Sequence, residues 1–135
     1  MDDGYCLIDQ TSEIVMFNFE NLDTWREAVD FADLVYAGTR RSPDEEKFGL
    51  TNQMRRAAVS ISSNLAEGSS RSSRQDFARF VEIAGGSLFE VVSQSFIGYK
   101  CGFLTDGQFK QLYTGAEKLG KMLSRLRSSL MERAK

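Results

Sequence analysis

The chain has 135 residues, of which 41% are hydrophobic and 27% charged, the composition of one ordinary soluble domain. It contains no histidine, which excludes catalytic triads, imidazole general bases and histidine-ligated metal sites. Cys6 and Cys101 form neither a disulfide framework nor a zinc pattern, so we expect reduced thiols in the cytoplasm. No apolar run approaches the roughly 18 residues that span a bilayer, and the acidic start Met1-Asp2-Asp3 is unlike a signal peptide. We therefore expect no membrane among its partners.

The net charge of −2 is unevenly distributed along the chain. Residues 1–20 carry five acids and no Lys or Arg, which leaves 17 basic and 14 acidic residues, a charge of +3, in residues 21–135. Within that part, residues 21–39 are acidic, whereas residues 104–135 hold seven basic residues against three acids. We predict an acidic N-terminal extension over residues 1–20 and a mildly basic domain over residues 21–135.

From residue 21 onward the apolar residues recur three and four positions apart, which predicts amphipathic helices. The first helix begins near Leu22 and ends at Gly38. Ser42-Pro43-Asp44-Glu45 has the pattern of a capping box, which opens a turn that Gly49 interrupts. Thr51 is then placed to cap a longer second helix that closes at Gly68.

The Ser- and Arg-rich stretch 68–74 is a low-complexity linker, in which Ser72 or Ser73 can cap a third helix that runs to about Lys100. Thr105 and Gln108 form another capping box, which opens a fourth helix with leucines at nearly heptad spacing. Four amphipathic helices with short connections predict an all-α, antiparallel up-down-up-down four-helix bundle.

Two segments depart from this regular pattern. Gly85-Gly86 lies in the middle of the third helix, where the simplest interpretation is tight packing against another backbone or bulky side chain. Residues 4–19 have β-rich composition around a turn-rich centre, which favours either a small β-hairpin or a poorly ordered acidic extension. If this extension is ordered, we expect it to lie on a partner subunit.

No motif predicts a cofactor, a metal or a catalytic group. Gly115–Met122 resembles a phosphate-binding loop, but Met122 stands where a hydroxyl would hold magnesium and no strand precedes it. Glu67, Glu82 and Glu90 lack the histidines that a di-iron bundle site requires. Paired carboxylates such as Glu82 and Glu90 are the sole motive for considering an enzyme.

A specific signature lies between residues 43 and 90. Its residues are Pro43, Glu46, Phe48-Gly49-Leu50-Thr51, Gln53, the string Arg55-Arg56-Ala57-Ala58-Val59-Ser60-Ile61-Ser62-Ser63-Asn64-Leu65-Ala66-Glu67-Gly68, and then Phe77, Phe80, Ile83-Ala84, Gly86-Ser87-Leu88 and Glu90. This signature resembles the four-helix-bundle proteins encoded within intervening sequences of bacterial 23S ribosomal RNA genes. The resemblance covers roughly residues 19 to 130, since Leu22, Trp25, Ala28 and Tyr36 also agree with the first helix of that family.

The resemblance implies a small cytoplasmic bacterial protein that assembles into a ring, commonly a homopentamer, and that is not an enzyme. Two branches of similar proteins are relevant to its function. One comprises the proteins of the ribosomal intervening sequences, which are associated with RNA. The other comprises accessory proteins of diversity-generating retroelements, which work with a reverse transcriptase and nucleic acid.

The residues themselves suggest where such a scaffold makes its contacts. A polar face of the second helix, with one residue of the third, is either a subunit interface or a solvated face: Gln53, Arg56, Ser60, Asn64, Glu67 and Glu90. Basic residues that could contact RNA or DNA lie in the linker and on the second and fourth helices: Arg55, Arg71, Arg74, Lys118, Lys121, Arg125 and Arg127. The alternative is a regulator that binds only protein, through the acidic first helix and extension.

Overall fold

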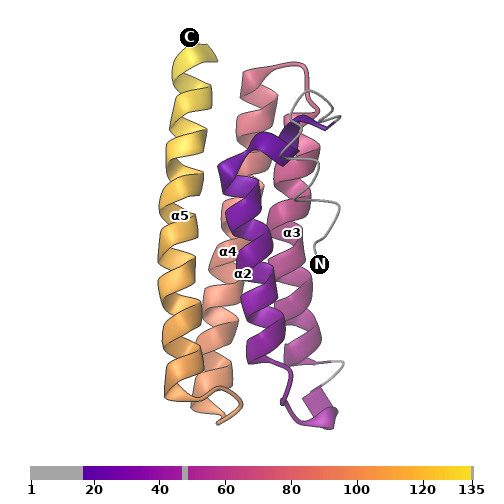
Figure 1. Cartoon of the computed structure of the whole chain (residues 1–135), viewed down its shortest axis with the longest axis vertical. Helices are drawn as coiled ribbons and strands as arrows, with labels where there is room; N and C mark the ends of the chain where they lie inside the picture. The colour runs from indigo at the N-terminus through magenta and orange to yellow at the C-terminus, as the bar shows by residue number, and fades with distance from the viewer. Residues whose placement is uncertain (1–16, 47–48, 135) are drawn as a thin grey trace.

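The computed structural model describes residues 17–46 and 49–134. Its long helices are α2 (Asp23–Gly38), α3 (Leu50–Ser69), α4 (Arg74–Lys100) and α5 (Asp106–Ala134), and the short 3-10 helices η1 (Asn18–Asn21) and η2 (Asp44–Glu46) precede α2 and α3. The long helices run alternately up and down (Figure 1). Each packs on two neighbours in the cycle α2, α3, α4, α5, which leaves α3 and α5 on a diagonal. The described residues contain no strand, and the predicted four-helix bundle is confirmed.

One apolar core holds the four helices together. The stripe of α3 is typical, because Met54, Ile61 and Leu65 recur at helical spacing and are fully buried. The other helices supply further fully buried side chains, among them Val35, Val81, Val91, Leu112 and Leu119. The buried apolar residues form one cluster, as expected of a single domain.

The predicted caps at Ser73 and at Thr105 are confirmed. The Ser73 hydroxyl accepts a hydrogen bond from the Asp76 amide, and Thr105 and Gln108 exchange both bonds of a capping box. The start of α3 differs from the prediction, since Thr51 is buried within its first turn. There the Glu46 carboxylate accepts the Leu50 amide at 3.0 Å, in place of a Thr51 cap.

The predicted hairpin over residues 4–19 lies mostly outside the described residues. At its described end, residues 18 and 19 belong to the 3-10 helix η1, so the hairpin prediction is wrong there. This turn is fixed by Asn18, whose side-chain amide donates to the Ser69 carbonyl and whose side-chain oxygen accepts from the Ser69 hydroxyl. Asn18 therefore attaches the beginning of the described chain to the end of α3.

Some glycines of the bundle are closely packed, whereas others face open space. A Cβ atom added to Gly68 would lie 2.6 Å from the Cβ of Phe80, and one added to Gly115 would lie 3.3 Å from Phe31, so both allow helices to approach closely. A Cβ added to Gly85 or Gly86 would meet no atom within 4 Å. The expectation that this pair serves tight packing is therefore wrong within one subunit, because the space beside it is open.

Among the described helices, α4 is long and apolar enough, by length and composition alone, to cross a membrane. This is weak evidence, because core helices of soluble bundles pass the same test. One third of its most apolar window is buried within the bundle. Much of its remaining hydropathy comes from exposed residues such as Phe89 and Phe96, which form a surface described below.

The turn between α4 and α5 is held by Gly102, with a φ of +83°, and by a bond across it. The Tyr99 hydroxyl donates to the Asp106 carboxylate. This hydrogen bond, with the charge of Asp106 and slight desolvation, raises the pKa of Tyr99 above its ordinary value of 10.0.

Replacing Asp106 by Asn should lower the pKa of Tyr99, measured by tyrosinate absorbance with Tyr99→Phe to identify the signal. Because the pKa of Tyr99 is higher in the folded state than in the unfolded state, the bond stabilises the fold fully at pH values below the unfolded pKa. That contribution is lost as the pH rises through the folded value. A titration unchanged by Asp106→Asn would contradict this bond.

Substitution of Gly68 by Ala tests the close contact of α3 with α4. The new methyl group must displace Phe80 at its Cβ, which is anchored to the backbone, so we expect a loss of about 1–2 kcal/mol in the free energy of unfolding. Gly107→Ala is the matched control, because its added Cβ would have only the Thr105 hydroxyl at 4.0 Å. Equal denaturation midpoints for the two variants would contradict the packing.

Candidate functional surfaces

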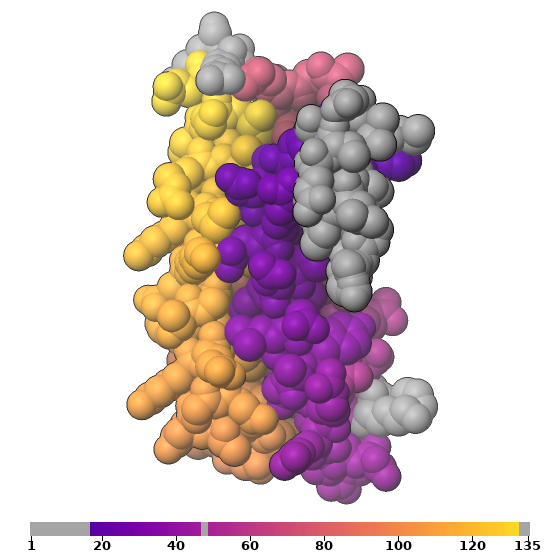
Figure 2. Space-filling view, in the orientation of Figure 1, coloured from indigo at the N-terminus to yellow at the C-terminus, as the bar shows by residue number. Residues whose placement is uncertain are grey.

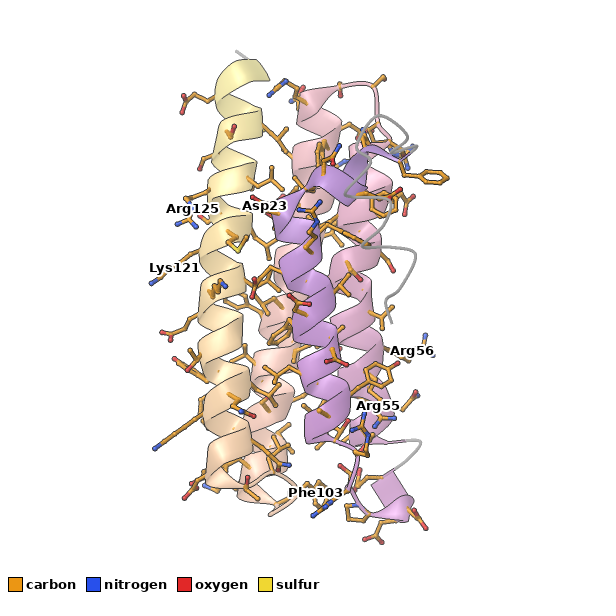
Figure 3. The ribbon with its side chains drawn as sticks, in the orientation of Figure 1. Asp23, Arg55, Arg56, Phe103, Lys121 and Arg125 are labelled. Atoms are coloured by element: carbon orange, nitrogen blue, oxygen red, sulfur yellow. The ribbon has the colours of Figure 1, made fainter. Side chains whose placement is uncertain are left out.

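The basic residues of the second and fourth predicted helices do not form one surface. Lys121 and Arg125 project from α5 on the left in Figure 3, whereas Arg55 and Arg56 project from α3 on the right. Between them lies α2, which occupies the middle of the face in Figure 2. This helix is acidic, and its Glu27 pairs with Lys118 of α5 at 3.2 Å. One subunit therefore has two separate basic surfaces.

The cations near the α3–α4 turn are largely paired with acids. Arg71 lies 3.1 Å from the Glu67 carboxylate and 4.8 Å from the centre of the Phe80 ring. Arg127 of α5 pairs with Glu82 of α4 at 3.4 Å. Arg74 is exposed and has no ion pair within the described part of the chain. Of these three predicted phosphate contacts, Arg71 and Arg127 are therefore partly neutralised by an acid, whereas Arg74 has no such acid partner among the described residues.

A basic hollow lies between the C-terminal end of α2 and the N-terminal half of α3. Arg55 donates from Nε to the Thr39 hydroxyl at 2.9 Å and from Nη2 to the Tyr36 carbonyl at 3.4 Å. Its guanidinium lies 4.5 Å from the centre of the Tyr36 ring. The hollow beside them has a volume of about 610 Å³, and Arg56 lines it as well. We call this site the Tyr36 hollow.

The polar face predicted as a subunit interface is divided between two roles. Ser60 forms a 2.9 Å hydroxyl contact with Ser87 of α4, and Asn64 donates to the Ser60 carbonyl at 2.8 Å. These half-buried residues join α3 to α4 within one subunit. Gln53, Arg56, Glu67 and Glu90 are exposed. In the described part of the chain Arg56 pairs with neither glutamate, because Glu67 is bound to Arg71 and Glu90 accepts from Gln94.

An apolar surface follows the outer side of α4 along α5, and sequence reasoning missed it. Phe89 is 79% exposed and Phe96 52% exposed. A groove of about 550 Å³ beside them is lined also by Val92, Tyr113 and Gly120, and the open Gly85–Gly86 pair continues it. Phe89 and Phe96 are seven residues apart, a spacing that could have indicated a second stripe. We call this the α4–α5 groove.

Aromatic rings fix one end of the α4–α5 groove. The ring centre of Phe109 lies 4.9 Å from those of Phe96 and Tyr99, and Phe96 approaches Tyr113 at 6.2 Å. Such contacts hold the exposed rings in place without covering them. The surface is therefore rigid as well as apolar.

The described residues contain no group of three Cys, Asp or Glu side chains that could hold a metal ion. The carboxylates considered in the sequence are engaged separately, Glu67 with Arg71, Glu82 with Arg127, and Glu90 with Gln94. No arrangement of nucleophile, base and oriented donor was found among the described side chains.

The fold and these surfaces define a small all-α bundle with separate basic surfaces and one apolar groove on its outside. The model of the family described as 23S rRNA-intervening sequence protein matches residues 20–125. The chain therefore belongs to the 23S rRNA-intervening sequence protein family, as the signature in the sequence predicted. A comparison with curated proteins finds no match.

Proposed function

We propose that the protein is a non-catalytic, homo-oligomeric scaffold or adaptor that acts in the cytoplasm, with five subunits in a ring. The observation that carries this proposal is the α4–α5 groove. Monomeric proteins seldom expose large contiguous apolar surfaces, because covering each 100 Å² of apolar area contributes about 2.5 kcal/mol. The open space at Gly85 and Gly86 admits the side chains of a second copy.

A closed ring requires two different surfaces on each subunit. We infer that the α4–α5 groove of one subunit meets the α3–α4 side of the next. That side carries the exposed Ile83 and Ile97 beside Glu67 and Glu90, two of the predicted interface residues. Because the two surfaces are adjacent sides of the bundle, successive contacts turn through an angle, which favours closure.

Light scattering during size-exclusion chromatography tests this assembly. Five chains of 15.2 kDa give about 76 kDa. Phe89→Ser should shift the mass toward that of one chain, because it places a polar side chain in the groove. Val29→Ser on α2 is the control, since Val29 is also exposed but lies outside both surfaces. A wild-type mass of 15.2 kDa would refute the scaffold.

Nucleic-acid contact is the second part of the proposal. It is supported by exposed cations without ion pairs in the described part of the chain, namely Arg56, Arg74, Lys121 and Arg125. Assembly repeats each of them around the ring, which supplies the number of phosphate contacts that counterion release requires. Action beside a reverse transcriptase is one form of this function. Exposed Asp30 and Asp33 on α2 instead support a regulator that binds only protein.

Binding at increasing salt concentration separates these two functions. Nucleic acid retained by untagged protein at low salt should dissociate steeply between about 50 and 200 mM salt, because released counterions drive the association. Lys121→Gln with Arg125→Gln should make that dependence shallower, and Asp30→Asn with Asp33→Asn should not. Protein free of nucleic acid at every salt concentration would favour the protein-binding regulator.

A further inference from the structure

We propose that the Tyr36 hollow binds a single-stranded segment of nucleic acid. One base stacks on the Tyr36–Arg55 pair, and the adjoining phosphates contact Arg56 and Arg40. This inference rests on the nucleic-acid contact of the proposed function, and it adds the strand state and the site.

The lining of the hollow distinguishes it from the other basic hollows of the bundle. Its polar side chains include Thr51, Asn52 and Ser60, and no carboxylate among the described residues lines it. The hollow at Arg79 and Arg127 also contains Asp76 and Glu82, and the one at Arg125 contains Asp23. A phosphate in either of those would face a like charge, whereas in the Tyr36 hollow it would face cations and uncharged donors.

The Tyr36–Arg55 pair is a planar surface that is fixed in advance. Two hydrogen bonds to α2 hold the guanidinium of Arg55 over the ring of Tyr36, which remains 39% exposed. Bases stack on aromatic rings and on guanidinium planes, and a surface that is already ordered loses little entropy when a base binds. Bases in a duplex are stacked on one another and cannot reach such a surface. We therefore expect the Tyr36 hollow to select single strands over duplexes.

Phosphates on either side of the stacked base have cations within the same region. Arg56 lines the hollow and has no ion pair in the described part of the chain. Arg40 is exposed and directly follows Thr39, the residue to which Arg55 is bonded. Both exposed cations are therefore available to the phosphates that adjoin the stacked base.

The simpler account is that Arg55 only satisfies carbonyl groups at the end of α2, a stabilising position for a cation. That role explains the bonds of Arg55 but explains neither the exposed ring of Tyr36 nor the unpaired Arg56. The test therefore leaves Arg55 intact and changes its two neighbours. Both are exposed, so their replacement leaves the core unchanged.

Fluorescence anisotropy on the full chain provides the test. The probes are labelled oligouridylate and oligothymidylate of about 12 nucleotides, within the site size of single-strand binding surfaces, and a duplex of equal length. We expect wild type to bind single strands more tightly than the duplex. Tyr36→Leu should weaken single-strand binding about tenfold with an unchanged salt dependence, because stacking carries no charge.

Arg56→Gln should weaken binding and reduce the slope against salt by about one phosphate contact. Lys110→Gln, which changes an exposed cation outside the hollow and the other proposed contacts, should leave the preference for single strands unchanged. Tighter binding of oligouridylate would identify RNA as the source of the strand, and tighter binding of oligothymidylate would identify DNA. Circular dichroism of each variant confirms that the helices are retained.

Two results would overturn the inference, and they differ in what they leave standing. If Tyr36→Leu and Arg56→Gln bind as wild type does while Lys121→Gln does not, the site is wrong and nucleic-acid contact stands. If wild type binds no probe at any salt concentration, the inference and the nucleic-acid part of the proposed function fail together.

Discussion

Helix α4 is part of the core on one side and part of the outer surface on the other. The other features of the bundle depend on this double role of α4. Its inward residues Leu88 and Val91 are buried between α3 and α5, so the bundle cannot form without them. A helix that packs on two neighbours along one side leaves the opposite side uncovered. On α4 that side is apolar at Phe89 and Phe96. One helix thus sustains the fold and creates the groove to which the proposed assembly is assigned.

The charged residues are also distributed unequally among the helices. The acidic helix α2 separates the cations of α3 from those of α5, and its Glu27 partly neutralises α5 by pairing with Lys118. At its C-terminal end, however, α2 presents carbonyl groups, which Arg55 satisfies at Tyr36. A single helix therefore lowers the positive charge along one side and concentrates it at one end. The exposed cations of one chain are therefore local, and the proposed assembly would extend them by repetition.

The helices and most of their caps were predictable because they depend on neighbours in the sequence, as the bond from the Asp76 amide to Ser73 illustrates. The cap of α3 was not predictable, since its Glu46 carboxylate arrives through a 3-10 turn. Apolar periodicity also places Tyr36 and Tyr99 in the stripes that face the core, although both are exposed. Periodicity identifies apolar residues, but it does not say how many sides of a helix have a neighbour. The seven-residue spacing of Phe89 and Phe96 could have suggested a second stripe, but the lining of the groove and of the hollow could be found only from the packed structure.

The open pair Gly85–Gly86 weakens α4 for as long as the chain is alone. Each glycine costs roughly 1 kcal/mol relative to alanine in a helix interior, and no atom within 4 Å of the vacant Cβ positions offsets that cost. A helix with such a weak centre opens locally more often than its neighbours. In the proposed assembly, another subunit would cover that centre and suppress the opening, which would link folding to assembly. Dilution should then loosen α4 from its middle outward, not by fraying from its ends.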